Sequence, residues 1–289
     1  MIFVDYSPVL ISCAHSAVAS MKKSPPDDPN VTEASIHHFR MLNTLRMVNV
    51  AYRKKYGKMV ICVDRKPYWR SREFPNYKKN RKPMDRTMDW KQFFDNGEDI
   101  LDACKNVFGW KVIDLPGIEA DDSIGVLVHE FADRGPHMIV SPDGDYKQLQ
   151  IHKGVNQYDV IRRKEIVEKN PEKWLRLKII TGDKKDGIPN IVSDVNTFMT
   201  EGARQSSIKN ADKKSWSSAE NPLFFCNQEM LERYQFNQLM LDMSKVPEDI
   251  KATIIEEYRK PPENPGNMYS YFAGHGIIRF LDQMGDFKS

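Results

Sequence analysis

The chain has 289 residues, of which 40% are hydrophobic and 29% charged, a composition typical of a globular protein with one large domain or two modest ones. No apolar run approaches the roughly 20 residues that span a bilayer, and the opening residues MIFVDYS lack the basic region of a secretory signal. The four cysteines form no CxxC pair, so they suggest neither a zinc site nor a disulfide framework, and they fit a reducing cytoplasm. The net charge of +3 says little about partners, but its distribution says more.

Short apolar runs in the first half of the chain predict β-strands, at residues 2–5, 59–64, 110–115 and 137–140. Between the first two, apolar residues recur at helical spacing over residues 36–52, with Thr32 as a cap and Gly57 as a stop. A second amphipathic helix is predicted over residues 124–131, ending near Gly135. This strand–helix–strand order predicts an α/β fold with a central, mainly parallel twisted sheet flanked by helices.

The character of the sequence changes near residue 180, where strand-like runs end. Residues 201–222 are polar and predict a long loop or a mobile segment, and the pattern from residue 223 onward is mostly helical. We therefore expect two domains, an α/β domain of residues 1–180 and a smaller helical domain of residues 181–289.

Nine carboxylates follow the predicted strands or open predicted helices in five short clusters. They are Asp5, Asp64, Glu119, Asp121, Asp122, Asp143, Asp145, Asp183 and Asp186. Ligand sites of open parallel sheets lie at the carboxyl ends of the strands, so these side chains can converge. Several carboxylates stay ionised in one cleft only when cations neutralise them, and oxygen ligands without histidine or cysteine favour Mg²⁺ or Mn²⁺. Two such ions would suit the hydrolysis of a phosphodiester.

Each cluster alone also has a simpler interpretation. Asp5 or Asp64 can be a turn residue, and carboxylates at the start of a helix interact favourably with its dipole. Asp143 and Asp145 can form an Asx turn, and TGDKKDG at residues 181–187 can be a solvated loop. The stretch DGDYKQLQ fits a calcium loop poorly, because its glycine comes too early. The combination of the five clusters is what favours a metal site.

A basic segment follows the second predicted strand. Residues 65–86 hold nine Lys or Arg against two acidic residues, with Tyr68, Trp69, Phe74 and Tyr77 interleaved. A solvated charged face is one interpretation, and a nucleic-acid surface is the other, in which cations contact phosphates and aromatic rings stack on unpaired bases. In the second case Lys78 or Arg70 could stabilise charge on a scissile phosphate.

The ordered motifs FVD, CVD, YWR…YKKNR, GIEADD, SPDGD and GDKKDG resemble the flap endonuclease / 5′-nuclease superfamily, and the likeness covers nearly the whole chain. The resemblance implies a metal-dependent 5′-3′ exonuclease and flap endonuclease with RNase H activity. Such an enzyme removes RNA primers and adjacent DNA from lagging-strand fragments during phage DNA replication. It also implies that residues 65–97 form an arch that admits single strands. The glycine-rich hairpin that usually follows the GDxxD motif is replaced here by GIPNIVSDVNTF, with one glycine.

The resemblance also assigns roles to individual residues. Asp5, Asp64, Glu119, Asp121 and Asp143 match the positions around the first metal, Asp122 an acidic neighbour, and Asp145, Asp183 and Asp186 the positions of the second. The expected catalytic residues are Lys78, Arg70, Asp64 and Asp143. The expected nucleic-acid contacts are Arg70, Arg72, Tyr77, Lys78, Lys79, Arg81, Lys82, Arg204 and Lys209.

The same resemblance implies two Mg²⁺ ions, which Mn²⁺ can replace, and a monomer in the cytoplasm of an infected bacterium. The implied substrates are forked, flapped or nicked DNA and RNA–DNA duplex, and a phage single-stranded DNA-binding protein is a candidate partner. Two alternatives remain open at this point. One is a ribonuclease of the related PIN type, and the other is a structure-specific DNA-binding module whose metal site has decayed.

Overall fold

The computed structural model describes residues 1–263 and 265–288, and its centre is a six-stranded sheet. The strands are β1 (Ile2–Asp5), β2 (Met59–Cys62), β3 (Lys111–Ile113), β4 (His137–Val140), β5 (Val155–Asp159) and β6 (Lys164–Ile166). Their order is β3-β2-β1-β4-β5-β6, and all neighbours pair in parallel except β5 and β6. The predicted mainly parallel sheet is confirmed. The two last strands were not predicted, because VNQYD and KEI carry too few apolar residues to stand out.

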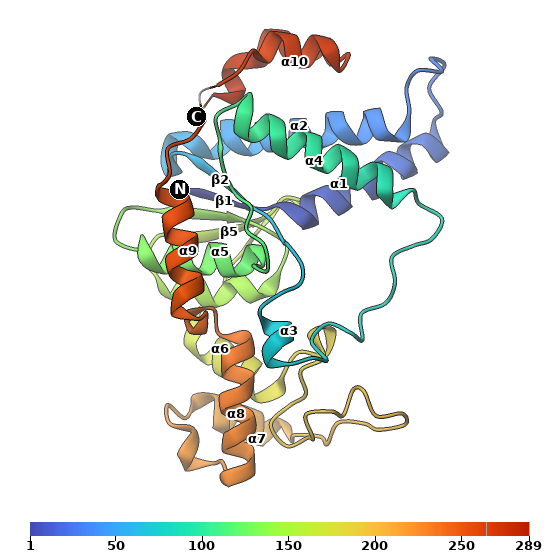
Figure 1. Ribbon diagram of the computed structural model, residues 1–289. Helices are drawn as coiled ribbons and strands as arrows, with labels where there is room; N and C mark the ends of the chain where they lie inside the picture. Colours follow the sequence, from blue (N-terminus) through green and yellow to red (C-terminus); the bar gives the residue numbers. More distant parts are fainter. Residues whose placement is uncertain (264, 289) are drawn as a thin grey trace.

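Successive side chains of a strand point to opposite faces, so the buried strands fill two core layers. Ile2 and Val4 face the layer of α1 (Tyr6–Lys23), α2 (Glu33–Tyr56) and α4 (Trp90–Asn106). Phe3 faces α5 (Ala120–Glu130) and α9 (Glu248–Arg259) on the other side. Figure 1 shows these two helical layers on either side of the strands. The helices thereby hold the strand ends in fixed positions.

Local sequence explains where α2 begins and ends. The Thr32 hydroxyl accepts a hydrogen bond from the backbone N–H of Ser35 at 3.2 Å, which caps the first turn. Gly57 ends the helix with a φ of 83°, a conformation that favours glycine. Both boundaries were predicted. Helix α1 was not, because its buried face consists partly of small residues such as Ala14 and Ala17, which obscure the apolar periodicity.

The second half of the chain is mostly helical. It contains α6 (Pro171–Thr181), α7 (Asn210–Ser218), α8 (Gln228–Leu241), α9 and α10 (Met268–Gly274), joined in part by short 3₁₀ turns. In Figure 1, α6, α7 and α8 form a group at one end, whereas α9 runs back along the sheet. The prediction of a loop over residues 201–222 is wrong for α7, where Trp216 stacks on Phe225. Apolar residues outside the segment stabilise this helix despite its polar composition.

Residues after α9 pack against the helices that cover one face of the sheet. Phe272, Phe280 and Phe287 are buried in the core layer that contains α2 and α4. The division into domains at residue 180 stays a prediction, because α9 packs on the second core layer and the residues after α9 pack on the first. Among the described residues, none of the helices is both long and apolar enough to cross a membrane.

Candidate metal centre

The carboxyl ends of β1, β2 and β4 lie at one edge of the sheet. Strand β1 lies between β2 and β4, and the chain builds outward from β1 on one side before returning to place β4 on the other. In an open sheet, a ligand site forms where the strand order reverses in this way. Asp5 is the last residue of β1, Asp64 follows β2 and Asp143 follows β4. The topology therefore brings together residues that are far apart in the sequence.

A pocket of about 550 Å³ lies at this edge. Its acidic lining residues are Asp5, Asp64, Glu119, Asp121 and Asp143. Lys78 and Arg81 from the basic segment line the same pocket. The five carboxylates that were matched to the first metal thus line one cavity, with two cations at its wall.

Asp5 lines this pocket and is almost completely buried. One of its oxygens accepts hydrogen bonds from the hydroxyls of Ser141 at 2.9 Å and Tyr146 at 3.1 Å, two residues that the sequence analysis did not single out. Burial raises the pKa of Asp5 well above its ordinary value, and the nearby charges of Asp64, Asp143 and Asp121 act in the same direction. The pocket is therefore a region of repelling negative charge that a bound cation would relieve.

The start of α5 supplies the acidic residues from the GIEADD motif. Glu119 is the N-cap, and its backbone N–H donates to the Asp122 carboxylate at 3.2 Å. The backbone N–H of Ala120 donates to Asp64 at 2.9 Å, so the helix start also orients a carboxylate from β2. The simpler interpretation of these acids as helix N-terminal charges is thus correct, and the same geometry leaves Glu119 and Asp121 facing the pocket.

Arg70 does not face the pocket, although it was expected near a scissile phosphate. It is 2% exposed, with one guanidinium nitrogen 2.9 Å from Glu119 and 2.8 Å from Asp122. Its Nε donates to the Met240 carbonyl at 3.0 Å, and the Trp69 indole N–H donates to Asp122 at 2.9 Å. Asp122 and Arg70 are therefore a buried layer beneath the pocket. They support Glu119 from behind rather than facing the cavity.

Lys78 differs from Arg70 because it lines the pocket and is only partly buried. Its ammonium forms an ion pair with Glu119, and its backbone N–H donates to the carbonyl of Asp186 at 2.9 Å. Burial lowers the pKa of Lys78, but the charges of Glu119, Asp186 and Asp121 outweigh it and raise the pKa above its ordinary value. The backbone φ of 60° is uncommon for a residue other than glycine, and such conformations cluster at functional sites. Lys78 is a permanent positive charge at the pocket wall.

The three acids matched to a second metal lie apart from the pocket lining and are already paired. The Lys178 ammonium lies 2.7 Å from Asp145 and also forms an ion pair with Asp183. Asp186 pairs with Arg81 at 2.5 Å. Burial raises the pKa of Asp145 to about 7 in spite of Lys178. The sequence analysis did not single out Lys178, which lies in α6.

The first group of acids has the chemistry that a hard divalent ion requires. Glu119, Asp121 and Asp122 place carboxylate oxygens within 4.8 Å of one another. One oxygen of Asp121 is buried and has no hydrogen-bond partner, and its ion pair with a guanidinium nitrogen of Arg70 is long, at 3.8 Å. A bound cation would satisfy this oxygen better. The acidic side chains of the pocket offer carboxylate oxygens as ligand atoms, which Mg²⁺ and Mn²⁺ prefer. These residues therefore fit a divalent metal ion.

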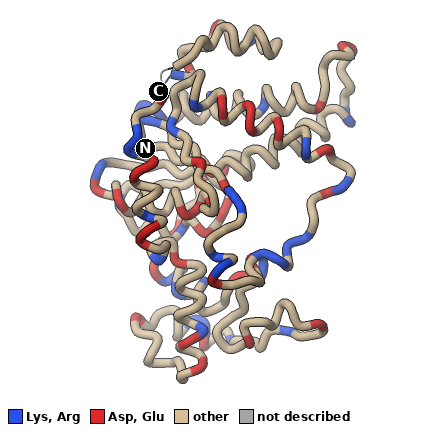
Figure 2. The backbone as a smooth tube through the Cα atoms, in the orientation of Figure 1, with Lys and Arg blue, Asp and Glu red and all other residues tan. Residues whose placement is uncertain are grey.

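The basic segment divides into a buried and an exposed part. Trp69, Phe74 and Tyr77 are buried, and the Tyr77 hydroxyl donates to Glu119 at 3.0 Å. Beyond α3 (Arg70–Glu73), the chain runs without regular structure to α4, and Figure 2 shows Lys and Arg spaced along this stretch. The exposed predicted contacts are Arg72, Lys79, Arg81, Lys82, Arg204 and Lys209. Tyr77 and Arg70 offer no comparable exposed surface.

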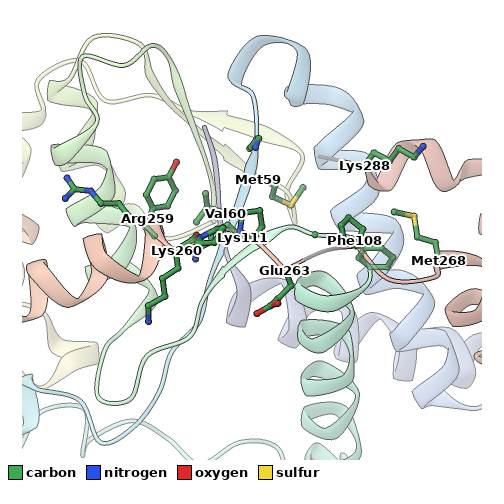
Figure 3. A pocket seen from close by; sticks show the side chains of 15 residues that line it. Met59, Val60, Phe108, Lys111, Arg259, Lys260, Glu263, Met268 and Lys288 are labelled. Carbon is green, nitrogen blue, oxygen red and sulfur yellow. Dashed lines mark hydrogen bonds between the residues drawn. The ribbon is translucent and has the colours of Figure 1, made fainter.

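A second pocket, of about 610 Å³, lies at the opposite edge of the sheet, where β2 and β3 begin. Figure 3 shows Phe108 and Met268 on one side of it and Arg259 and Lys260 on the other. Its only acidic lining residue among the described parts of the chain is Glu263. It holds none of the predicted site residues, so the acidic pocket is the stronger candidate for the chemistry.

Comparisons with known proteins find two family models and several relatives that match this chain. The family "5′-3′ exonuclease, N-terminal resolvase-like domain" matches residues 14–176, and the family "T4 RNase H, C terminal" matches residues 170–287. The ribonuclease H of Enterobacteria phage T4 is 29% identical over 292 residues, covering 96% of this chain and 95% of that protein. A 5′-3′ exonuclease of Buchnera aphidicola is 30% identical over 149 residues, 48% of this chain and 49% of that one.

Among solved structures, a bacteriophage T5 flap endonuclease in a complex with DNA and metal ions has a similar fold. Its TM-score is 0.60 at 17% sequence identity, and the match covers 90% of this chain and 99% of that chain. A T5 protein co-crystallised with metal ions gives a TM-score of 0.57 at 19% identity, covering 89% of this chain and 99% of that chain. At these identities the likeness concerns the fold.

Proposed function

The chain belongs to the 5′-3′ exonuclease family, and from this membership and the acidic pocket we propose that it hydrolyses phosphodiester bonds near 5′ ends with divalent metal ions. The substrates we propose are flapped, forked or nicked DNA and RNA-primed duplex. This proposal is supported by the likeness to a phage ribonuclease H along almost the whole chain. The related phage T5 enzyme has been solved with DNA and metal ions.

The observation that carries the proposal is the convergence of carboxylates from three strand ends and one helix start on a single pocket beside Lys78. In a protein that only binds DNA, five carboxylates in this cavity would repel the DNA phosphates and weaken binding. A polyanion approaches such a cavity only when metal ions and basic residues offset its negative charge.

We propose Mg²⁺ as the natural ion, in two copies. Bound there, the ions would supply an activated water and stabilise the leaving oxygen. Asp5, Asp64, Glu119, Asp121 and Asp143 would hold the first. Asp145, Asp183 and Asp186 would hold the second, for which Lys178 and Arg81 must give up their present pairings.

The chain's own cations have separate tasks in this proposal. Lys78 places positive charge at the pocket wall, where a scissile phosphate would lie. Arg70 opposes the rise in the pKa of Glu119 and Asp122 that burial causes, and it orients both carboxylates from beneath. Exposed cations such as Lys79 and Lys82 contact phosphates of the flap or duplex without reading sequence.

The test uses two duplexes, one with a 5′ DNA flap and one with a 5′ RNA primer, each labelled in turn at its 5′ and 3′ end. Wild type and Asp143→Asn are incubated with Mg²⁺, with Ca²⁺ and with EDTA. We expect wild type with Mg²⁺ to release short 5′ products, and Asp143→Asn to bind both duplexes without cutting them. Binding by wild type without cleavage in any metal would contradict the proposal, and products released from the 3′ end would contradict its polarity.

A further inference from the structure

A second group of metal-ligating side chains lies outside the acidic pocket. His38 of α2, Asp99 of α4 and His275, which follows α10, place one ligand atom each within 4.8 Å of one another. None of the three lines the acidic pocket. Figure 1 shows α10 above the α2 and α4 pair, so the group joins the end of the chain to the first helical layer. Three separate segments thus meet at two imidazoles and one carboxylate.

The hydrogen bonds of His275 leave its Nε2 and an Asp99 oxygen facing each other without a hydrogen between them in the neutral imidazole. Its Nδ1 lies 2.8 Å from the carbonyl oxygen of Tyr271, which can only accept, so Nδ1 must carry the hydrogen. Its Nε2 lies 3.2 Å from an oxygen of Asp99. In the neutral imidazole that nitrogen is an acceptor, and two acceptors would then face each other. A cation must lie between them, either a proton on Nε2 or a metal ion.

Two of the surrounding hydrogen bonds, those of His275 and Asp99 to Tyr271, are typical of a metal ligand set. A ligating histidine almost always donates its other ring N–H to a carbonyl or carboxylate, as His275 does. The Tyr271 hydroxyl donates to Asp99 at 3.1 Å and so orients the carboxylate. His38 Nε2 lies 3.8 Å from the same Asp99 oxygen and 2.9 Å from the Tyr271 hydroxyl, a contact that a metal ion on Nε2 would replace. Ligands of a tetrahedral zinc ion at about 2.0–2.1 Å lie roughly 3.3 Å apart. The Asp99 oxygen lies 3.2 Å from the His275 nitrogen and 3.8 Å from the His38 nitrogen, close to that spacing.

We propose that His38, Asp99 and His275 bind one transition-metal ion of the zinc class, with water as the fourth ligand. Imidazole nitrogens select such ions over Mg²⁺, so this site and the acidic pocket would take different metals. The bound ion would cross-link the segment after α10 to α2 and α4. This inference does not depend on the proposed nuclease function.

Cobalt(II) is the probe, because its visible absorption distinguishes tetrahedral from octahedral sites. Metal-free wild type is titrated in excess Mg²⁺, which competes with Co²⁺ for any site built from oxygen ligands. The variants are His275→Gln and Asp99→Asn, whose side chains are 34% and 45% exposed, so both proteins should fold, and circular dichroism checks this. The matched control is His152→Gln, from a pair in which His152 lies 2.8 Å from His129.

We expect one equivalent of tetrahedral Co²⁺ in wild type, affinity lowered more than about 10-fold in both variants, and no change in the control. Zn²⁺ should raise the melting temperature of wild type and not that of His275→Gln. Absence of the tetrahedral bands in wild type would overturn the proposal and leave a proton between His275 and Asp99. Unchanged binding in His275→Gln, or loss of binding in His152→Gln, would also overturn it.

Discussion

The guanidinium of Arg70, beneath the acidic pocket, lies 2.9 Å from the carboxylate of Glu119 in the pocket lining, and both side chains are almost completely buried. Burial raises the pKa of Glu119 to about 7, with Asp121 acting in the same direction and Lys78 and Arg70 opposing it. The pocket therefore rests on a buried ion pair. Arg70 stabilises the folded protein and the ionised pocket at once, and its role can be separated from that of Lys78 by experiment.

Replacing Arg70 should lower the free energy of unfolding of the protein. Arg70→Gln leaves the buried Asp122 without its cation and Glu119 with Lys78 alone, and breaking a buried pair in this way costs about 3–5 kcal/mol. Urea denaturation measures the free energy of unfolding. The control is Arg72→Gln in the same helix, where the side chain is exposed and the expected change is within about 0.5 kcal/mol. Equal stability of the two variants would contradict this account of Arg70.

Replacing Lys78 should instead affect catalysis. Lys78→Met removes the positive charge at the pocket wall, and the loss of one such electrostatic contact lowers a rate about 10²–10³-fold. Single-turnover cleavage of a 5′ flap measures this rate. In Lys79→Met, which removes an exposed neighbouring cation, we expect weaker binding and a nearly unchanged rate at saturating substrate. If both variants cleave at the wild-type rate, Lys78 has no role in the transition state.

Lys178 should compete with the second metal ion. Its ammonium lies between Asp145 and Asp183, where it offsets their negative charge. Lys178→Met removes this competitor, so we expect a second Mn²⁺ to bind more tightly, by roughly 10-fold, as measured by paramagnetic resonance of free Mn²⁺. An unchanged second binding constant would mean that the Lys178 pairing does not oppose metal binding.

Metal affinity should depend on pH near neutrality. Glu119 and Asp145 both have a pKa of about 7 in the metal-free protein, and a carboxylate must lose its proton to bind a metal. We therefore expect Mg²⁺ affinity to fall as the pH is lowered from about 8 to about 6, with protons released on binding. Calorimetry in buffers of different ionisation enthalpy measures both effects. An affinity that stays constant over this range would contradict the assignment.

Glu119 and Asp145 should also make the stability of the metal-free protein depend on pH. Metal affinity rises with pH, whereas their contribution to the free energy of unfolding falls. The pKa values of Glu119 and Asp145 in the folded protein, about 7, lie above their ordinary values of 4.5 and 3.8. At pH values between the ordinary and the folded pKa, the folded state therefore binds more protons than the unfolded state. Their contribution is fully present at acid pH and is lost as the pH rises through 7. Metal-free unfolding experiments at several pH values should show this loss, and Mg²⁺ should abolish it.

Several elements of the site were predictable because parallel strands bring their carboxyl ends to one edge. That rule alone places Asp5, Asp64 and Asp143 together once three strands are recognised in FVD, CVD and MIVSPD. The Asx-turn interpretation of SPDGDY was also correct, since Asp143 accepts from the backbone N–H of Asp145 at 2.9 Å. A turn residue and a pocket carboxylate are therefore the same side chain.

The remaining features depend on distant contacts that a sequence pattern does not reveal. Arg70 is buried because it meets the Met240 carbonyl, 170 positions away in the chain. Asp122 turns away from the pocket because side chains in a helical turn point in successive directions, and the Trp69 indole occupies that side. The aromatic residues of the basic segment look the same in sequence whether they face solvent or pack inside.

The location of bound ions tests the central claim most directly. Crystals of wild type soaked in Mn²⁺ would be measured at a wavelength where manganese scatters anomalously, with Asp121→Asn crystals as the control. We predict a strong peak among Asp5, Glu119, Asp121 and Asp143, and its loss or weakening in Asp121→Asn. An empty acidic pocket at saturating Mn²⁺, with activity intact in solution, would contradict the account that these carboxylates hold the ions needed for cleavage.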